Sequence, residues 1–114
     1  MVRNWKDVEK RVTLWLDKGP IHATRESTGR RGEAVEDISW GPISVELKTR
    51  EEIPAYVKMW MKQAKRNSEG KIPVVVWHED RMGMGKQLAI LFLTDFRALV
   101  ELAYGKESDA STNI

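Results

Sequence analysis

A carboxylate and an amine lie two residues apart in the segment Ser44-Val45-Glu46-Leu47-Lys48, where polar and apolar residues alternate. Alternation at a period of two predicts a β-strand with Glu46 and Lys48 on one face. Asp37 begins the preceding apolar segment, and Gly41-Pro42 predicts a tight turn between the two strands. The antiparallel hairpin that results is expected to bring Asp37 opposite Glu46.

Two carboxylates this close repel each other unless a cation lies between them. Oxygen ligands without a nearby cysteine or histidine suit Mg²⁺ or Mn²⁺, which keep several waters and bind phosphate oxygens. Such an ion lowers the pKa of a bound water and neutralises a phosphoryl group under attack. Lys48, on the same face, can orient that water or stabilise the charge that develops on the phosphate. The pattern predicts metal-dependent hydrolysis of a phosphodiester.

A Glu-x-Lys triplet is short, and the chain contains a second one at Glu69-Gly70-Lys71, within a predicted turn. The alternative interpretation of Glu46 and Lys48 is an exposed ion pair on a strand, worth about 0 to 1 kcal/mol. The triplet alone favours this alternative. The choice between the two therefore depends on the wider pattern of the chain.

The rest of the sequence predicts helices and strands in the order α, β, β, β, α, β, β, α. Helices are expected over residues 4–17, 51–68 and 94–102, and strands over residues 21–25, 38–40, 43–49, 72–77 and 87–93, with the last two strands buried. Loops are expected at 26–33 and 82–85. This order predicts an α/β (α+β) fold with a central mixed β-sheet flanked by helices. We expect one domain over residues 1–104 and a disordered tail over 105–114.

The composition argues against a membrane-spanning protein, a disulfide-linked protein and a zinc site. The chain of 114 residues is 32% charged and 41% hydrophobic, and it has no apolar run near the ~20 residues that cross a bilayer. Its charged first residues argue against a signal peptide, and the absence of cysteine excludes disulfides and cysteine-ligated zinc. His22 and His78 are too few and too separated for a zinc site. We expect a cytoplasmic protein without a membrane partner, whose net charge of +2 does not by itself indicate a polyanionic ligand.

A wider set of residues, inside and outside the hairpin, completes the pattern. They are Glu9 in the first helix, the Ser27-Thr28-Gly29 loop, Glu36-Asp37-Ile38, the run from Val45 to Arg50, and Gln63 in the second helix. In these positions the chain resembles the PD-(D/E)xK nuclease superfamily, and within it the Holliday-junction-resolvase-like proteins of archaea and phages. The resemblance covers roughly residues 5–95. Glu36 stands where that family often has a proline, so Glu33 and Glu36 are alternative ligands to Asp37.

The resemblance implies a restriction-endonuclease-like domain that cleaves DNA with Mg²⁺ or Mn²⁺. It implies Asp37, Glu46 and the Leu47 carbonyl as metal ligands, Lys48 as the catalytic lysine, Glu9 as an outer acidic ligand and Gln63 as a further catalytic residue. The implied function is a Holliday junction resolvase, a homodimer because a four-way junction needs two opposed cuts. Its location would be the host cytoplasm if a phage encodes it. Alternatives are a nicking or nonspecific duplex nuclease and a non-catalytic DNA-binding module.

Phosphate contacts require only positive charge and hydrogen-bond donors. The predicted DNA-binding residues are Arg25, Ser27, Arg30, Arg31, Lys62 and Arg66. The arginines before Asp37 are expected beside the metal, whereas the basic residues of the second helix can equally be solvated surface. The five tryptophans mostly fall on predicted apolar faces, which favours core packing or a subunit interface over base stacking.

Overall fold

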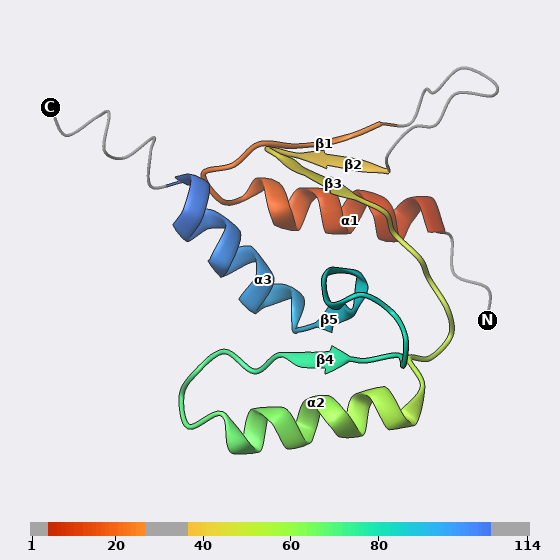
Figure 1. Ribbon diagram of the computed structural model, residues 1–114. Helices are drawn as coiled ribbons and strands as arrows, with labels where there is room; N and C mark the ends of the chain where they lie inside the picture. The colour runs from red at the N-terminus through yellow and green to blue at the C-terminus, as the bar shows by residue number, and fades with distance from the viewer. Residues whose placement is uncertain (1–4, 27–36, 106–114) are drawn as a thin grey trace, which may run out of the picture. The chain divides into compact units, whose positions relative to one another are not determined.

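The computed structural model describes residues 5–26 and 37–105 (Figure 1). The elements are α1 (Trp5–Asp17), β1 (Ala23–Arg25), β2 (Ile38–Trp40), β3 (Ile43–Val45), α2 (Ala55–Asn67), β4 (Val75–Trp77), the 3-10 turn η1 (Met84–Lys86), β5 (Leu88–Ile90), α3 (Leu93–Val100) and the π-helical turn η2 (Glu101–Gly105). The α+β class and the order of the main elements are confirmed. The chain divides into two compact units, residues 1–49 with 99–114 and residues 50–98, which are described separately.

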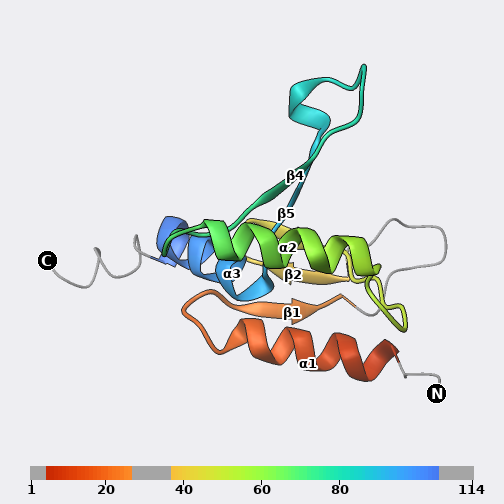
Figure 2. The same cartoon turned by 90° about the horizontal axis from the view of Figure 1, so that it is seen from below.

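The first unit is built on a three-stranded antiparallel sheet in the order β1-β2-β3. Helix α1 contacts β1 and β2 and covers one face of this sheet (Figures 1 and 2). The largest side chains that are fully buried are Trp40, Leu16 and Ile38, from the strands and the helix. Burial of apolar side chains between helix and sheet is therefore what holds this unit together.

Helix α1 buries two polar residues beside an apolar one. The buried positions are Glu9, Thr13 and Leu16, whereas Trp5 and Leu14 are exposed. The Thr13 hydroxyl donates to the Glu9 backbone carbonyl over 2.7 Å, which satisfies this polar group inside the interface. Glu9, the predicted outer acidic ligand, therefore lies on the buried face of the helix.

The turn between β2 and β3 requires a glycine. Gly41 has a φ of +56°, and a Cβ atom at this position would lie 2.7 Å from Cγ2 of Ile21. The turn pairs Trp40 with Ile43 and Ile38 with Val45, which confirms the predicted antiparallel hairpin. Because its register is set by this turn, the hairpin also determines which residues can meet Asp37.

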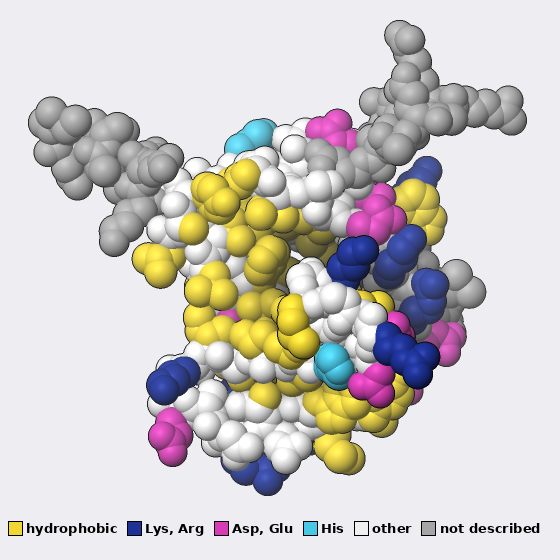
Figure 3. Space-filling view, in the orientation of Figure 1, with side chains coloured by type: hydrophobic (Ala, Val, Ile, Leu, Met, Phe, Trp, Pro, Cys, Tyr) yellow, Lys and Arg dark blue, Asp and Glu magenta, His cyan; other side chains and the backbone are white. Residues whose placement is uncertain are grey.

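The second unit contains α2 and the two-stranded antiparallel sheet β4-β5, whose hairpin carries η1 (Figure 2). The loop of the hairpin is held by Gln87, whose side-chain amide donates to the Met82 carbonyl (2.8 Å) and accepts from the Glu79 backbone amide (2.7 Å). Met61 is buried, but many apolar side chains of this unit remain exposed (Figure 3).

Several predicted elements differ from the structure. The strands predicted as buried, 72–77 and 87–93, reduce to Val75–Trp77 and Leu88–Ile90, and most of their residues are exposed. The described residues form two separate antiparallel sheets, and the predicted central mixed sheet is not seen among them. Helix α2 begins only after Pro54, because proline is tolerated at a helix start and not within a helix. None of the helices in the described ranges has the length and hydrophobicity to span a bilayer.

Candidate active site

Asp37 lies at the entrance to β2 and is held to the neighbouring strand by its backbone and its side chain. Its backbone N–H donates to the carbonyl of Val45 (3.1 Å), the residue that also pairs with Ile38. Two residues of one strand thus face one residue of the other, as in a β-bulge, which redirects side chains at the end of a strand. The Asp37 carboxylate oxygen Oδ2 accepts from the Leu47 backbone N–H over 2.6 Å. The structure therefore brings Asp37 to the backbone between Glu46 and Lys48.

Glu46 and Lys48 follow β3, and both side chains point to solvent. Their exposed fractions are 60% and 72%, and Lys48 Nζ lies 3.1 Å from Glu46 Oε1. Val45, Leu47 and Thr49, which alternate with Glu46 and Lys48 along the chain, are partly buried. The predicted alternation therefore continues after the strand ends. This places a carboxylate and an ammonium group on one accessible face, beside the peptide that binds Asp37.

Glu9 and Arg25, predicted as an outer metal ligand and a DNA contact, meet each other in the structure. Arg25 Nε donates to Glu9 Oε1 over 3.0 Å, and the exposed fractions of the two side chains are 31% and 6%. Arg25 pairs with Ile38 in the sheet, so it lies on the face that α1 covers. A buried carboxylate needs such a partner, and this ion pair links the first helix to the first strand.

Glu26 is a carboxylate near the site that the sequence pattern did not indicate. Its backbone N–H donates to the Asp37 carbonyl over 3.1 Å, which continues the pairing of Arg25 with Ile38 by one residue. Its residue is exposed. The sequence predicts Glu26 in a loop, and in the structure β1 does end at Arg25, one residue before it.

The other predicted residues lie elsewhere. Gln63, Lys62 and Arg66 belong to α2 in the second unit and are exposed. Ser27, Arg30 and Arg31, with the alternative ligands Glu33 and Glu36, lie outside the described residues. Their predicted roles stay predictions.

The donor set of the first unit suits a hard cation that keeps part of its water shell. Asp37, Glu46 and the Leu47 carbonyl would supply oxygen ligands only, as Mg²⁺ and Mn²⁺ prefer. Within residues 5–26 and 37–105, no group of three or more acidic, histidine or cysteine side chains gathers to hold an ion. Mg²⁺ commonly takes one or two carboxylates together with waters and substrate phosphates, so two carboxylates and a carbonyl fit it.

A second polar constellation connects the end of α1 to β1. Asp17 Oδ1 accepts from the Ala23 backbone N–H (2.9 Å) and lies 2.8 Å from His22 Nδ1, while His22 Nε2 lies 2.9 Å from Thr24 Oγ1. The Ala23 hydrogen bond, with the neighbouring His22, lowers the pKa of Asp17 from its usual value, against the opposing effect of burial. The carboxylate, imidazole and hydroxyl follow one another in the order of a catalytic triad, in which a third group orients the base that activates the nucleophile. His22 is 80% exposed, so water competes for each group and the contacts act chiefly to join helix and strand.

Comparison with protein-family models, with curated proteins and with solved structures finds no match for this chain. The interpretation of the site therefore depends on its residues and their geometry.

Proposed function

We propose that this protein is a Mg²⁺- or Mn²⁺-dependent endonuclease that hydrolyses phosphodiester bonds in DNA. The observation that carries the proposal is the hydrogen bond of Asp37 to the Leu47 amide, which fixes this carboxylate between Glu46 and Lys48. Asp37, Glu46 and the Leu47 carbonyl would hold the metal, which would supply a more acidic bound water and a positive charge to offset that of the phosphate. Lys48 orients that water or stabilises the phosphate charge.

The exposure of the site supports a large substrate. Glu46 and Lys48 stand on an open surface, so a DNA backbone can approach them without a conformational change. The proposed substrate is branched DNA, with the four-way junction as the best candidate, because the pattern of residues resembles junction resolvases. The proposal includes a restriction-endonuclease-like fold, a homodimer that makes two opposed cuts, and a cytoplasmic location.

The proposal is tested with an end-labelled four-way junction and a linear duplex of the same sequence, each with Mg²⁺, with Mn²⁺ and with chelator. We expect metal-dependent paired cuts in the junction. Glu46→Gln should lower the cleavage rate at least about a hundredfold, because it removes a charged ligand from the metal. Its matched control is Glu69→Gln in the second Glu-x-Lys triplet, which should cleave at the wild-type rate.

Each alternative gives its own result. Equal cleavage of junction and duplex would identify a nicking or nonspecific nuclease with the same site. Binding to DNA without cleavage under either metal would identify a DNA-binding module and contradict the proposed activity. Equal loss of activity in Glu46→Gln and Glu69→Gln would show that the exposed carboxylates act only through overall charge.

A further inference from the structure

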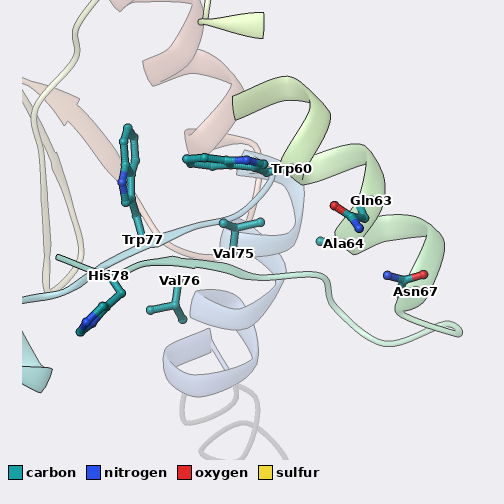
Figure 4. A pocket seen from close by; sticks show the side chains of 8 residues that line it. All are labelled: Trp60, Gln63, Ala64, Asn67, Val75, Val76, Trp77 and His78. Carbon is teal, nitrogen blue, oxygen red and sulfur yellow. The ribbon is translucent and has the colours of Figure 1, made fainter. Parts of the chain in front are cut away.

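A pocket of about 560 Å³ lies between α2 and β4, entirely within the second unit (Figure 4). Its lining includes Trp60, Gln63 and Asn67 of the helix and Val75 and Trp77 of the strand. Figure 4 shows the Trp60 ring over Val75 and the Trp77 ring beside it, with the side-chain amides of Gln63 and Asn67 farther along α2. The pocket therefore has an aromatic end and a hydrogen-bonding end.

The aromatic end is a preformed wall. The ring centroids of Trp60 and Trp77 are 5.0 Å apart and their planes meet at 87°, and Tyr56 packs edge-to-face against both at 5.2 and 5.9 Å. Mutual packing of this kind fixes the rings before any ligand arrives. Trp77 nevertheless remains 39% exposed and Tyr56 50% exposed, so the cluster is not simply the interior of the unit.

The hydrogen-bonding end is available to a ligand. Gln63 and Asn67 are four residues apart on α2, which places their side chains on the same helix face as Trp60. Among the residues that the structure describes, neither side-chain amide forms a hydrogen bond. Each offers one acceptor and two donors, the pairing that matches the edge of a nucleobase.

We propose that this pocket binds one unpaired nucleobase of a DNA substrate, stacked on Trp77, one of the two perpendicular indole rings, and hydrogen-bonded by Asn67 and Gln63. Base stacking on aromatic side chains tolerates any sequence, because every base has a π-face, and it requires a base free of its duplex partner. That the ring belongs to DNA rests on the proposed function. The pocket itself follows from the residues of α2 and β4.

Recognition here depends on the base and not on the phosphates. At about 100° per residue, the four basic residues of α2 are turned about 100° or more away from the centre of the pocket-lining positions. These residues are Lys58, Lys62, Lys65 and Arg66. Attraction of the DNA backbone to them would therefore add to the affinity equally with and without a base in the pocket, and salt would weaken it.

The test measures binding in chelator, where no cleavage occurs, by quenching of tryptophan fluorescence. The probes are a single-stranded oligothymidylate of about twelve residues and the same backbone carrying abasic residues in place of its bases. We expect the base-containing strand to bind about tenfold more tightly, and the ratio to persist as salt is raised.

Trp77→Ala and Asn67→Ala should each reduce this ratio toward one, whereas Trp77→Phe should keep most of it because a flat ring remains. Trp5→Ala is the matched control, since Trp5 is an exposed tryptophan on α1 in the other unit. Circular dichroism and thermal unfolding show whether Trp77→Ala is folded, and Asn67→Ala tests the pocket with its aromatic wall intact.

Equal affinity for the two strands, no binding to either, or a ratio unchanged in Asn67→Ala and Trp77→Ala would overturn the proposal. The result is separate from that for the nuclease activity. Base-dependent binding without metal-dependent cleavage would support the base-binding pocket and contradict the nuclease activity. Cleavage without base-dependent binding would support the nuclease activity and contradict the pocket.

Discussion

The first unit contains two ion pairs of the same charge in opposite surroundings. Glu9 and Arg25 meet between α1 and β1, where the Glu9 side chain is 6% exposed. Glu46 and Lys48 meet after β3 at nearly the same distance, with more than half of each side chain exposed. Two contacts between a carboxylate and a cation therefore have different consequences in the two places.

Burial decides what each pair can do. Removing one partner of a buried pair leaves a charge without solvent, which costs far more than the pair contributes. An exposed pair contributes about 0 to 1 kcal/mol, so its groups can exchange partners with little loss of stability. Glu46 and Lys48 can thus exchange their contact for the proposed metal and phosphate at little cost in stability, whereas the Glu9–Arg25 pair contributes to the fold.

The largest effect is expected from Arg25→Met. This substitution leaves the Glu9 carboxylate buried without its partner, and we expect the free energy of unfolding to fall by about 2 to 3 kcal/mol. The value lies below that of a fully buried pair because Arg25 keeps 31% of its side chain exposed. Urea unfolding followed by circular dichroism measures it.

The double variant Glu9→Leu with Arg25→Met is the control for the buried pair. Replacing both charges with apolar groups removes the unpaired carboxylate, so most of the lost stability should return. If Arg25→Met alone changed the free energy of unfolding by less than about 0.5 kcal/mol, Glu9 would be solvated. Glu9 and Glu46 would then not differ in burial.

A smaller loss is expected from Gly41→Ala, in the turn that sets the register of the exposed pair. The new Cβ would lie 2.7 Å from Ile21 Cγ2 in a backbone conformation that favours glycine. We expect about 1 to 2 kcal/mol of destabilisation in the same urea experiment. Gly83→Ala is the matched control, because its φ is −57° and no atom lies within 4 Å of the added Cβ. Equal losses in the two variants would contradict the argument.

Lys48→Met and Glu46→Gln should change the free energy of unfolding by less than about 1 kcal/mol each. Both side chains project into solvent, so neither leaves a buried charge behind. Thermal unfolding of the two variants beside the wild type measures this. Destabilisation as large as that of Arg25→Met would show that Glu46 and Lys48 are structural, and it would remove the basis for assigning them to catalysis.

Local patterns in the sequence predicted the elements around the site but not the contacts across the fold. The Gly41-Pro42 turn and the alternation after Ile43 follow from neighbouring residues, and both are found in the structure. The pairing of Glu9 with Arg25 joins residues sixteen positions apart and depends on how α1 rotates on the sheet. The bulge that turns Asp37 toward the Leu47 amide is a detail of strand pairing, which periodicity does not encode.

In the second unit, the local sequence predicted where a strand forms but not whether it is buried. The apolar run before Trp77 predicted a buried strand, because β-branched residues in sequence usually lie inside a sheet. Within the described residues 50–98, β4 pairs with β5 alone, and Val74 and Val76 remain exposed. Apolar composition thus predicted the strand at β4, whereas its exposure depends on which elements pack against it.

Asp17 is a third carboxylate of the first unit, intermediate between Glu9 and Glu46 in exposure, and it gives the smallest predicted effect. The Ala23 N–H and His22 hold the pKa of Asp17 below its unfolded value of 3.8, so folding favours the ionised form. Its contribution to stability is present above that value and is lost as the pH falls through the lower folded pKa. Asp17→Asn should therefore be less stable than the wild type at neutral pH, and the two should converge between about pH 5 and about pH 2 in urea unfolding.

His22→Ala should keep most of the pH dependence, because the Ala23 hydrogen bond is its larger cause. A difference between Asp17→Asn and the wild type that did not change with pH would mean that the carboxylate acts only as a neutral hydrogen-bond acceptor.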